Sequence, residues 1–227
     1  MLRLDRLLAN LGYGSRREVI PMVRGGRVDV DGTQVFDPSM KARAADVCLD
    51  GVTLDHPDGV LVMLNKPVDV VCSHEPEEGT RAYDLVPPHW EYRNPRVETV
   101  GRLDKDTSGL LVLTDDHQLL HRLTSPKHHV VKRYEATLAS PYDDAMGAAL
   151  ASGTLLIDGD EKPCLPAVIE VLGAQSIAIS ITEGRYHQVR RMVAACGNHV
   201  DTLHRTHFGE WSLGDLAEGQ WTDIQRA

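Results

Sequence analysis

The chain of 227 residues is 42% hydrophobic and 25% charged, which is typical of a globular protein with one large and one small domain. No apolar run approaches the roughly 20 residues that cross a bilayer, and the N-terminus lacks the apolar core of a signal peptide. We therefore expect a cytoplasmic protein without a membrane partner. The formal net charge of −9 argues against a protein that coats nucleic acid without specificity, because such binding depends on neutralising phosphates.

The cysteines are too scattered to suggest a disulfide framework or a zinc site, because no Cys-x-x-Cys pair occurs. The four are Cys48, Cys72, Cys164 and Cys196. Three histidines lie close together in sequence, but their spacing matches no zinc-ligand pattern. These are His199, His204 and His207. We expect reduced thiols and no bound metal.

The first 35 residues predict two helices and a hairpin. Leucines at mixed three- and four-residue spacing over residues 2–11 indicate a short amphipathic helix. Ser15 and Glu18 form a capping-box pattern, which predicts a second helix from residue 16. Pro21 falls inside this helix and removes one backbone hydrogen bond, so we expect a kink or a late helix start. The Asp31-Gly32 turn separates two short predicted strands.

This N-terminal part is basic although the chain as a whole is acidic. Residues 1–28 contain six arginines and two carboxylates. The order of the elements, with Gly-Arg-Val-x-Val-Asp-Gly at 26–32, resembles the S4-like RNA-binding module over about residues 2–50. The resemblance implies phosphate contacts, whereas the charges alone are more typical of a solvated helix face. The candidate RNA-binding residues are Arg3, Arg16, Arg17, Arg24 and Arg27.

A short polar segment divides the chain into two predicted domains. Residues 55–59 carry Pro and Gly, so we expect a linker between an S4-like domain at 1–54 and a larger domain at 60–227. Residues 75–94 lack periodicity and predict a long loop. Strands are predicted at 60–64, 110–113, 133–138, 167–171 and 176–181, and a helix at 187–195. The expected fold class is α+β with a mixed, largely antiparallel sheet.

An acidic side chain in a glycine-bounded loop is the strongest candidate for chemistry. Residues 101–116 are Gly-Arg-Leu-Asp-Lys-Asp-Thr-Ser-Gly-Leu-Leu-Val-Leu-Thr-Asp-Asp. The apolar run predicts a buried strand, and Gly101 and Gly109 permit close backbone approach by a ligand. Asp104 is therefore expected on a short loop just before that strand, although a loop aspartate by itself is more often a turn former.

The motif around Asp104, Gly-Arg-Leu-Asp-x-x-Thr-Ser-Gly-Leu-Leu, is very similar to the active-site motif of pseudouridine synthases that modify ribosomal RNA. Further motifs of that family occur in the family's order along the chain, at Asn65-Lys66-Pro67, Lys132-Arg133-Tyr134 and 183–192. One position departs from the pattern, because Asp69 stands where the family has a glycine. The conformation of that turn is therefore in doubt, but the chemistry is not.

The resemblance implies conversion of uridine to pseudouridine without a cofactor. It makes Asp104 the catalytic carboxylate, either as a nucleophile or as the base that starts elimination at the sugar. It implies that Arg190 forms an ion pair with Asp104 and keeps the carboxylate anionic, and that Tyr134 stacks on the uracil and is a candidate acceptor of the C5 proton. Candidate pocket residues are Arg102, Leu103 and Leu203. Arg102 is also a competing partner for Asp104. Further candidate RNA contacts are Lys127, Lys132, Arg185, His187, Arg191 and Arg205.

Two segments, 124–129 and 197–205, look most like the family's small-subunit ribosomal RNA enzyme. We therefore expect a monomeric enzyme whose partner is 16S ribosomal RNA or a small-subunit assembly intermediate. The same reaction on 23S ribosomal RNA remains open, as does a non-catalytic assembly factor that uses the pocket only for binding. The intact set of Asp104, Tyr134 and Arg190 favours the enzyme.

Overall fold

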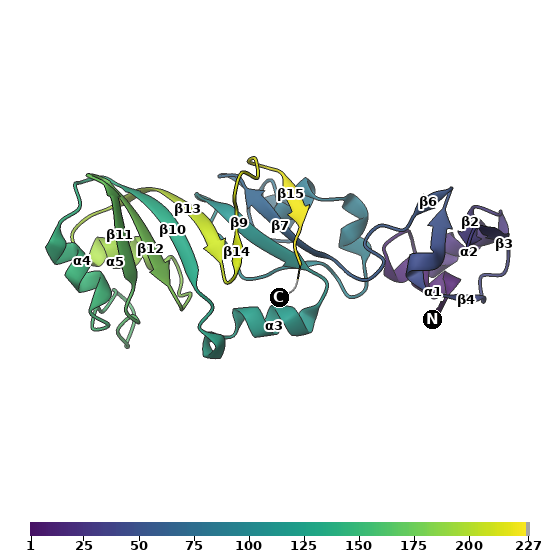
Figure 1. Ribbon diagram of the computed structural model, residues 1–227, viewed down its shortest axis with the longest axis horizontal. Coiled ribbons are helices and arrows are strands. Elements are labelled where there is room, and N and C mark those ends of the chain that lie inside the picture. Colours follow the sequence, from purple (N-terminus) through teal and green to yellow (C-terminus); the bar gives the residue numbers. More distant parts are fainter. Residues whose placement is uncertain (226–227) are drawn as a thin grey trace.

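The computed structural model describes residues 1–225 and has an elongated shape (Figure 1). Residues 1–54 lie at one end of the long axis, and a large sheet fills the middle and the other end. No helix in the described part of the chain is long and apolar enough to cross a membrane. All four cysteines are free thiols, as predicted. Residues 1–225 contain no group of three or more His, Cys, Asp or Glu side chains that could hold a metal.

The N-terminal unit contains two helices and short strands around its own apolar core. Its helices are α1 (Leu4–Asn10), α2 (Arg16–Arg24) and the 3-10 turn η1 (Ala44–Asp46). Its strands are β1 (Leu2–Arg3), β2 (Val28–Val30), β3 (Thr33–Val35), β4 (Lys41–Ala42), β5 (Val47–Leu49) and β6 (Val52–Thr53). The sheet order is β3-β2-β5-β6, and β1 pairs separately with β4. The prediction that the first helix begins at residue 2 was wrong, because Leu2 and Arg3 form the β1–β4 ladder.

Helix α2 begins where the capping box predicts. The Ser15 backbone N–H donates to Glu18 Oε2 at 2.7 Å, which satisfies a donor at the helix end. Pro21 lies within the helix and does not delay its start, so that alternative of the prediction was wrong. Val19 and Val23 are fully buried against α1, and this packing holds the helix despite the hydrogen bond that Pro21 cannot make.

The large domain is a nine-stranded mixed sheet with helices and turns around it. Its strands are β7 (Leu61–Lys66), β8 (Glu98–Thr99), β9 (Thr107–Thr114), β10 (Lys132–Leu138), β11 (Val168–Gly173), β12 (Ser176–Ile181), β13 (Val200–Phe208), β14 (Trp211–Ser212) and β15 (Trp221–Asp223). Its helices are α3 (His117–Thr124), α4 (Asp144–Ala151) and α5 (Gln188–Ala195). The main order is β11-β12-β10-β13-β9-β7-β15.

The sheet confirms the predicted mixed, largely antiparallel α+β class. Strands β9 and β13 pair in parallel at its centre, and the neighbouring pairs on the main path are antiparallel. Side chains of β9 alternate between two apolar layers: Leu111 and Leu113 lie in one, Leu110 and Val112 in the other. The apolar run at 110–113 is therefore a buried strand with a core on each face, as expected.

The segment predicted as a long loop contains more structure than its sequence indicates. Residues 75–94 include the 3-10 turns η2 (Pro76–Glu78), η3 (Ala82–Leu85) and η4 (Pro88–Tyr92). Tyr83 and Trp90 from these turns are buried in the main core. Isolated aromatic residues anchor the segment, and such anchors leave no periodic pattern in the sequence.

The expected linker is packed tightly between the two parts of the molecule. The Asp55 carboxylate accepts hydrogen bonds from Trp90 Nε1 at 2.5 Å and contacts His89 Nε2 at 2.8 Å. The Asp55 backbone N–H donates to the Tyr13 hydroxyl at 2.8 Å, which ties the N-terminal unit to the same point. These polar contacts and the Tyr13–His89 ring stack hold the segment between the two parts.

Candidate active site

Two of the three predicted catalytic residues, Asp104 and Tyr134, line one pocket of about 500 Å³, a size typical of ligand sites, and Arg190 is not among its lining residues. Asp104 lies on the loop before β9, Tyr134 on β10 and Leu203 on β13, and the loop before α5 closes a further side. Arg102 and Leu103 also line the pocket, as predicted. The crossing of these segments at the centre of the mixed sheet brings together motifs that are about 100 residues apart in sequence.

Hydrogen bonds with Cys72 and Asp69 hold the Asp104 loop in place. The Leu103 backbone N–H donates to the Cys72 thiol at 3.5 Å, and burial raises the pKa of that thiol, which keeps it protonated. Asp69 N–H donates to Lys105 O at 2.8 Å from a left-handed turn with φ of 63°. This turn forms with Asp in place of Gly, because aspartate tolerates that conformation better than most residues.

Lys66, from the Asn-Lys-Pro motif, lies close enough to the same loop to interact with its carboxylates. Its ammonium is fully buried and donates to Pro67 O at 2.8 Å and Val70 O at 2.7 Å. Burial lowers the pKa of Lys66, and the nearby carboxylates of Asp104 and Asp106 oppose that shift. Lys66 therefore supplies positive charge beneath the acidic loop while fixing the turn that supports it.

His187 is the side chain that faces the Asp104 carboxylate. Its Nε2 lies 3.2 Å from Asp104 Oδ1, and both side chains are about one third exposed, at 37% and 34%. His187 precedes α5 in a left-handed conformation with φ of 48°, and its ring stacks on Tyr186 at a centroid distance of 3.9 Å. The family resemblance predicts an RNA contact for His187 and not this pairing, which no local pattern indicates.

The predicted ion pair between Arg190 and Asp104 does not form in this structure. Arg190 Nη2 instead lies 2.9 Å from Asp106 Oδ2, and the same nitrogen donates to Asp106 O at 3.1 Å. Arg190 Nη1 donates to Val200 O at 2.7 Å, so the guanidinium links the loop to the start of β13. The prediction failed because Asp106, two residues further along the loop, occupies the position closer to α5.

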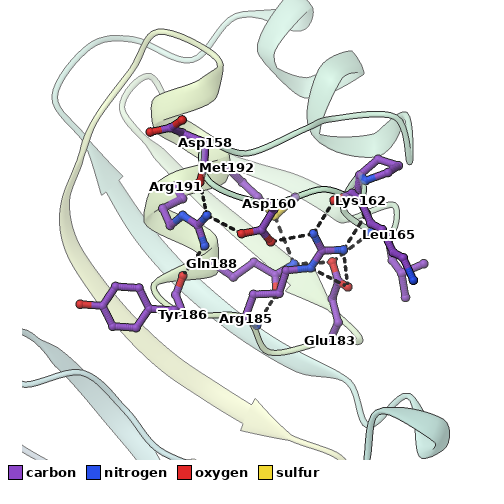
Figure 2. A network of polar contacts seen from close by, with 11 residues as sticks. Asp158, Asp160, Lys162, Leu165, Glu183, Arg185, Tyr186, Gln188, Arg191 and Met192 are labelled. Atoms are coloured by element: carbon purple, nitrogen blue, oxygen red, sulfur yellow. Dashed lines mark hydrogen bonds and ion pairs between the residues drawn. The ribbon is translucent and has the colours of Figure 1, made fainter.

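A polar network holds the loop that carries His187 (Figure 2). The Asp160 carboxylate forms ion pairs with Arg185 Nη1 at 2.9 Å and with Arg191 Nη2 at 2.6 Å, one through each of its oxygens. Arg185 also donates to Lys162 O and Pro163 O, both at 2.6 Å. Hydrogen bonds from Arg191 and then from Arg185, together with their charges, lower the pKa of Asp160 and keep it charged. The donors of Arg185 and Arg191 are mostly taken within the protein, so the structure favours positioning over the RNA contacts predicted for them.

Arg205 lines the pocket and is buried, so it does not lie on the outer surface. It is 2% exposed, and its Nε donates to Leu110 O at 2.7 Å. Arg205 is buried because β13 runs through the centre of the sheet, so RNA could meet this predicted contact residue only inside the pocket. Gly109 makes the arrangement possible: a Cβ there would lie 2.3 Å from Arg205 O. The close approach predicted at Gly109 is therefore by the β13 backbone, not by a ligand.

The predicted RNA-binding arginines of the N-terminal unit are exposed but differ in their pairing. Asp5 pairs with Arg3 at 2.9 Å and Arg16 at 3.1 Å. Hydrogen bonds from Arg3 are the main cause that lowers the pKa of Asp5. Arg27 is paired with Asp50 at 2.5 Å. In the described chain, the exposed side chains without an ion pair include Arg17, Arg24 and Lys127.

The geometry can be compared with known proteins. Residues 60–195 match the family described as RNA pseudouridylate synthase, and residues 2–48 match the S4 domain. The chain is 42% identical to ribosomal small subunit pseudouridine synthase A of Escherichia coli (strain K12) and 39% identical to that of Pasteurella multocida (strain Pm70), over 98% of this chain and 96% of each relative. It is 40% identical to the uncharacterized RNA pseudouridine synthase YtzG of Bacillus subtilis (strain 168), over 98% of this chain and 95% of that one.

One solved structure has the same architecture along the whole chain. It is a crystal structure of a pseudouridylate synthase with a TM-score of 0.68 and 36% sequence identity, and the match covers 99% of this chain and 96% of the other. The sequence similarity, the fold and the pocket around Asp104 therefore all indicate the same family. The chain belongs to the RNA pseudouridylate synthase family and carries an S4 domain at its N-terminus.

Proposed function

We propose that the protein converts one uridine of small-subunit (16S) ribosomal RNA to pseudouridine, with Asp104 as the catalytic carboxylate. The observation that carries the proposal is the position of Asp104 in a pocket that also contains Tyr134 and Leu203. Two relatives are named ribosomal small subunit pseudouridine synthase A, and these names support the choice of RNA. The predicted cytoplasmic location would follow from this substrate, and the monomeric state and the domain limits 1–54 and 60–227 stay predictions.

The reaction needs a carboxylate at ribose C1′ and a flat pocket for a base that detaches and turns. Asp104 either attacks C1′ or removes a proton from the sugar, and in both cases the C1′–N1 bond breaks. Tyr134 is 8% exposed, and its ring lies where a uracil can stack, against the apolar wall that includes Leu203. After the base turns, C5 bonds to C1′. In the nucleophilic route the Asp104–C1′ bond breaks as C5 attacks, and in the elimination route Asp104 returns its proton to C2′. C5 then loses its proton, for which the Tyr134 hydroxyl is the candidate acceptor.

His187 and Arg190 have separate roles in this proposal. His187 orients the Asp104 carboxylate from 3.2 Å. Arg190 holds the rest of the loop through Asp106 and the Asp106 backbone. The carboxylate is thereby fixed from two sides before substrate arrives, and such preorganisation lowers the barrier to attack or proton removal.

A uridine in folded RNA must leave its base stack to reach this pocket. Unstacking costs a few kilocalories per mole, which phosphate contacts elsewhere on the RNA offset. The N-terminal unit supplies unpaired cations at Arg17 and Arg24, and Lys127 adds one beside the pocket on the 3-10 turn η5 (Pro126–His128). The acidic remainder of the chain restricts binding to RNA that fits these cations.

The test is pseudouridine mapping on unmodified small-subunit RNA and on partly assembled small subunits. Carbodiimide labelling with primer extension compares wild type, Asp104→Asn and the control Asp201→Asn, whose exposed carboxylate lies outside the pocket lining. We expect one new stop with wild type and with the control, and none with Asp104→Asn, while RNA affinity stays within about threefold for all three.

Three outcomes would contradict the proposal in different ways. Product formed by Asp104→Asn would exclude the proposed mechanism. No product on either small-subunit substrate, but a stop on large-subunit RNA, would keep the reaction and replace the substrate. Tight binding with no product on any ribosomal RNA would favour the assembly factor.

A further inference from the structure

The charged groups that line the pocket do not balance one another. They are Arg102, Asp104, Lys132, Glu183, Arg185, His187 and Arg205. Asp104 contacts His187. Glu183 is engaged by Arg185 at 3.2 Å and also accepts hydrogen bonds from the protein. Arg102 is exposed to solvent. The two cations that remain are Lys132 on β10 and Arg205 on β13. Neither forms an ion pair with a carboxylate of the described residues, although the charge of Glu183 acts on Lys132.

Arg205 is a buried cation whose donors are only partly used. One hydrogen bond, from Nε to Leu110 O, fixes the guanidinium. Nη2 is buried and has no acceptor in the described chain. The guanidinium carbon lies 5.0 Å from the centroid of the Phe208 ring and 6.0 Å from that of the Tyr134 ring. Aromatic faces partly compensate a buried cation, but an unused donor and an unpaired charge remain costly unless a ligand satisfies them.

Lys132 extends the same positive site. The register pairs Lys132 with Phe208 and Tyr134 with Arg205, so both cations and both rings lie on neighbouring positions of one face. Lys132 Nζ donates to Val130 O at 3.0 Å and lies 5.9 Å from the Phe208 ring centroid. Burial first, and then the charge of Arg205, lower the pKa of Lys132 to about 8, and the charge of Glu183 only partly opposes this shift.

The proposed reaction supplies an anion at this place. When the C1′–N1 bond breaks, its electron pair stays on N1, and the base departs as the uracil anion with charge shared among N1, O2 and O4. Either C1′ bonds to the Asp104 carboxylate or, in elimination, C2′ gives a proton to that carboxylate and a double bond forms between C1′ and C2′. Both routes therefore place one negative charge on the detached base, next to the ring of Tyr134.

We propose that Arg205, assisted by Lys132, binds the detached uracil as an anion and so stabilises the transition state in which the C1′–N1 bond breaks. This inference rests on the proposed function, because it deepens the role of the same pocket. A preorganised cation at the point where charge develops contributes most in a site that excludes water. Removal of such a group typically costs about 100-fold or more in rate, and the neutral ground-state base gains less from it than the anion does.

The test compares single-turnover rates of Arg205→Met, Arg205→Lys and Lys132→Met on the RNA that wild type modifies. The matched control is Arg133→Met, because Arg133 lies between Lys132 and Tyr134 but is ion-paired with Glu135 and Glu170. We expect about a 100-fold loss for Arg205→Met, a smaller loss for Lys132→Met, and partial recovery in Arg205→Lys. RNA affinity and the control rate should stay within about threefold of wild type.

A second substrate separates charge stabilisation from a merely structural role. In RNA that carries 5-fluorouridine at the target, fluorine withdraws electrons and makes the departing base a more stable anion. The rate deficit of Arg205→Met, measured as disappearance of 5-fluorouridine from nuclease digests, should then shrink about tenfold compared with uridine. A variant that is slow only because its fold is disturbed would show the same deficit on both substrates.

Each result has a definite meaning. A rate of Arg205→Met within threefold of wild type, or an equal deficit on both RNAs, would overturn the inference. If Arg205→Met does not fold, as judged by circular dichroism, Lys132→Met and Arg205→Lys decide by the same comparison of substrates. If wild type forms no pseudouridine on any ribosomal RNA, the proposed function fails, and this is visible before any variant is measured.

Discussion

His187 Nε2 lies 3.2 Å from Asp104 Oδ1, and this contact joins the loop before β9 to the loop before α5. The replacement His187→Asn removes the contact, because the shorter side chain cannot reach the carboxylate. We expect the single-turnover rate to fall by about 10- to 100-fold through loss of orientation, with RNA affinity unchanged. Rapid-quench kinetics with saturating enzyme provides the measurement. An unchanged rate would show that Asp104 is held well enough by its own loop.

The Asp160 network predicts an indirect effect on the same pair. Asp160→Asn weakens the contacts to Arg185 and Arg191, so the loop with His187 should loosen. We expect a lower melting temperature and a lower rate with unchanged RNA affinity, measured by thermal unfolding, kinetics and filter binding. Asp158→Asn is the control, because Asp158 contributes its backbone carbonyl to Arg191. A normal rate for Asp160→Asn would mean that the network serves stability alone.

The buried ion pair of Arg93 and Asp115 should be a major contributor to stability. The two side chains are 2% and 11% exposed and lie 3.0 Å apart. Arg93→Met leaves Asp115 buried without its partner, so the free energy of unfolding should fall by about 3 kcal/mol. Urea unfolding gives this value. The control Arg96→Met, at an exposed arginine 4.0 Å from Glu91, should change stability by less than about 0.5 kcal/mol.

Asp55 predicts a pH dependence of stability. Burial by itself raises the pKa of Asp55, but hydrogen bonds from Trp90 and His56 outweigh burial, and the net pKa is lowered. The folded state thus binds this proton less readily than the unfolded state, whose Asp pKa is about 3.9. The stabilisation is present above that value and is lost as pH falls through the lowered folded pKa.

Urea unfolding of wild type and Asp55→Asn at pH 7 and in steps below pH 5 tests this sign. The stability difference between the two proteins should be largest at neutral pH and should shrink as the solution becomes acidic. Asp58→Asn, an exposed neighbour, serves as the control. A difference that stays constant with pH would show that the carboxylate charge of Asp55 does not contribute.

The pairing of the arginines in the N-terminal unit predicts unequal contributions to RNA binding. Arg17→Ala and Arg24→Ala should each reduce the slope of log affinity against log salt by about 0.7 to 0.9, which is one phosphate contact. Arg27→Ala should change the slope less, because Asp50 already neutralises that charge. Filter binding from low to high salt measures the slopes. Equal effects of all three would mean that RNA displaces Asp50.

Local sequence patterns were sufficient where a structure depends on neighbours in the chain. The capping box of α2 and the apolar run of β9 formed as predicted. Both depend on residues only a few positions apart in the chain, so the local sequence indicates them. Asp104, Tyr134 and Leu203 were identified from motifs, and they do line one pocket. The left-handed turn at Asp69 could not be predicted with equal certainty, because the residue type permits that conformation without requiring it.

Only the tertiary structure decided which charged groups meet. Arg190 pairs with Asp106 and not with Asp104, and His187 takes the place expected for the arginine. Arg205 is a buried wall of the pocket because β13 pairs with both β9 and β10 at the centre of the sheet. The sequence by itself therefore determined the family and which residue types are available at the site. Packing determined which charged side chains pair with each other and which are buried. The physical reason is that an ion pair depends on distances of a few ångströms between segments far apart in the chain, and these distances are fixed only when the core forms.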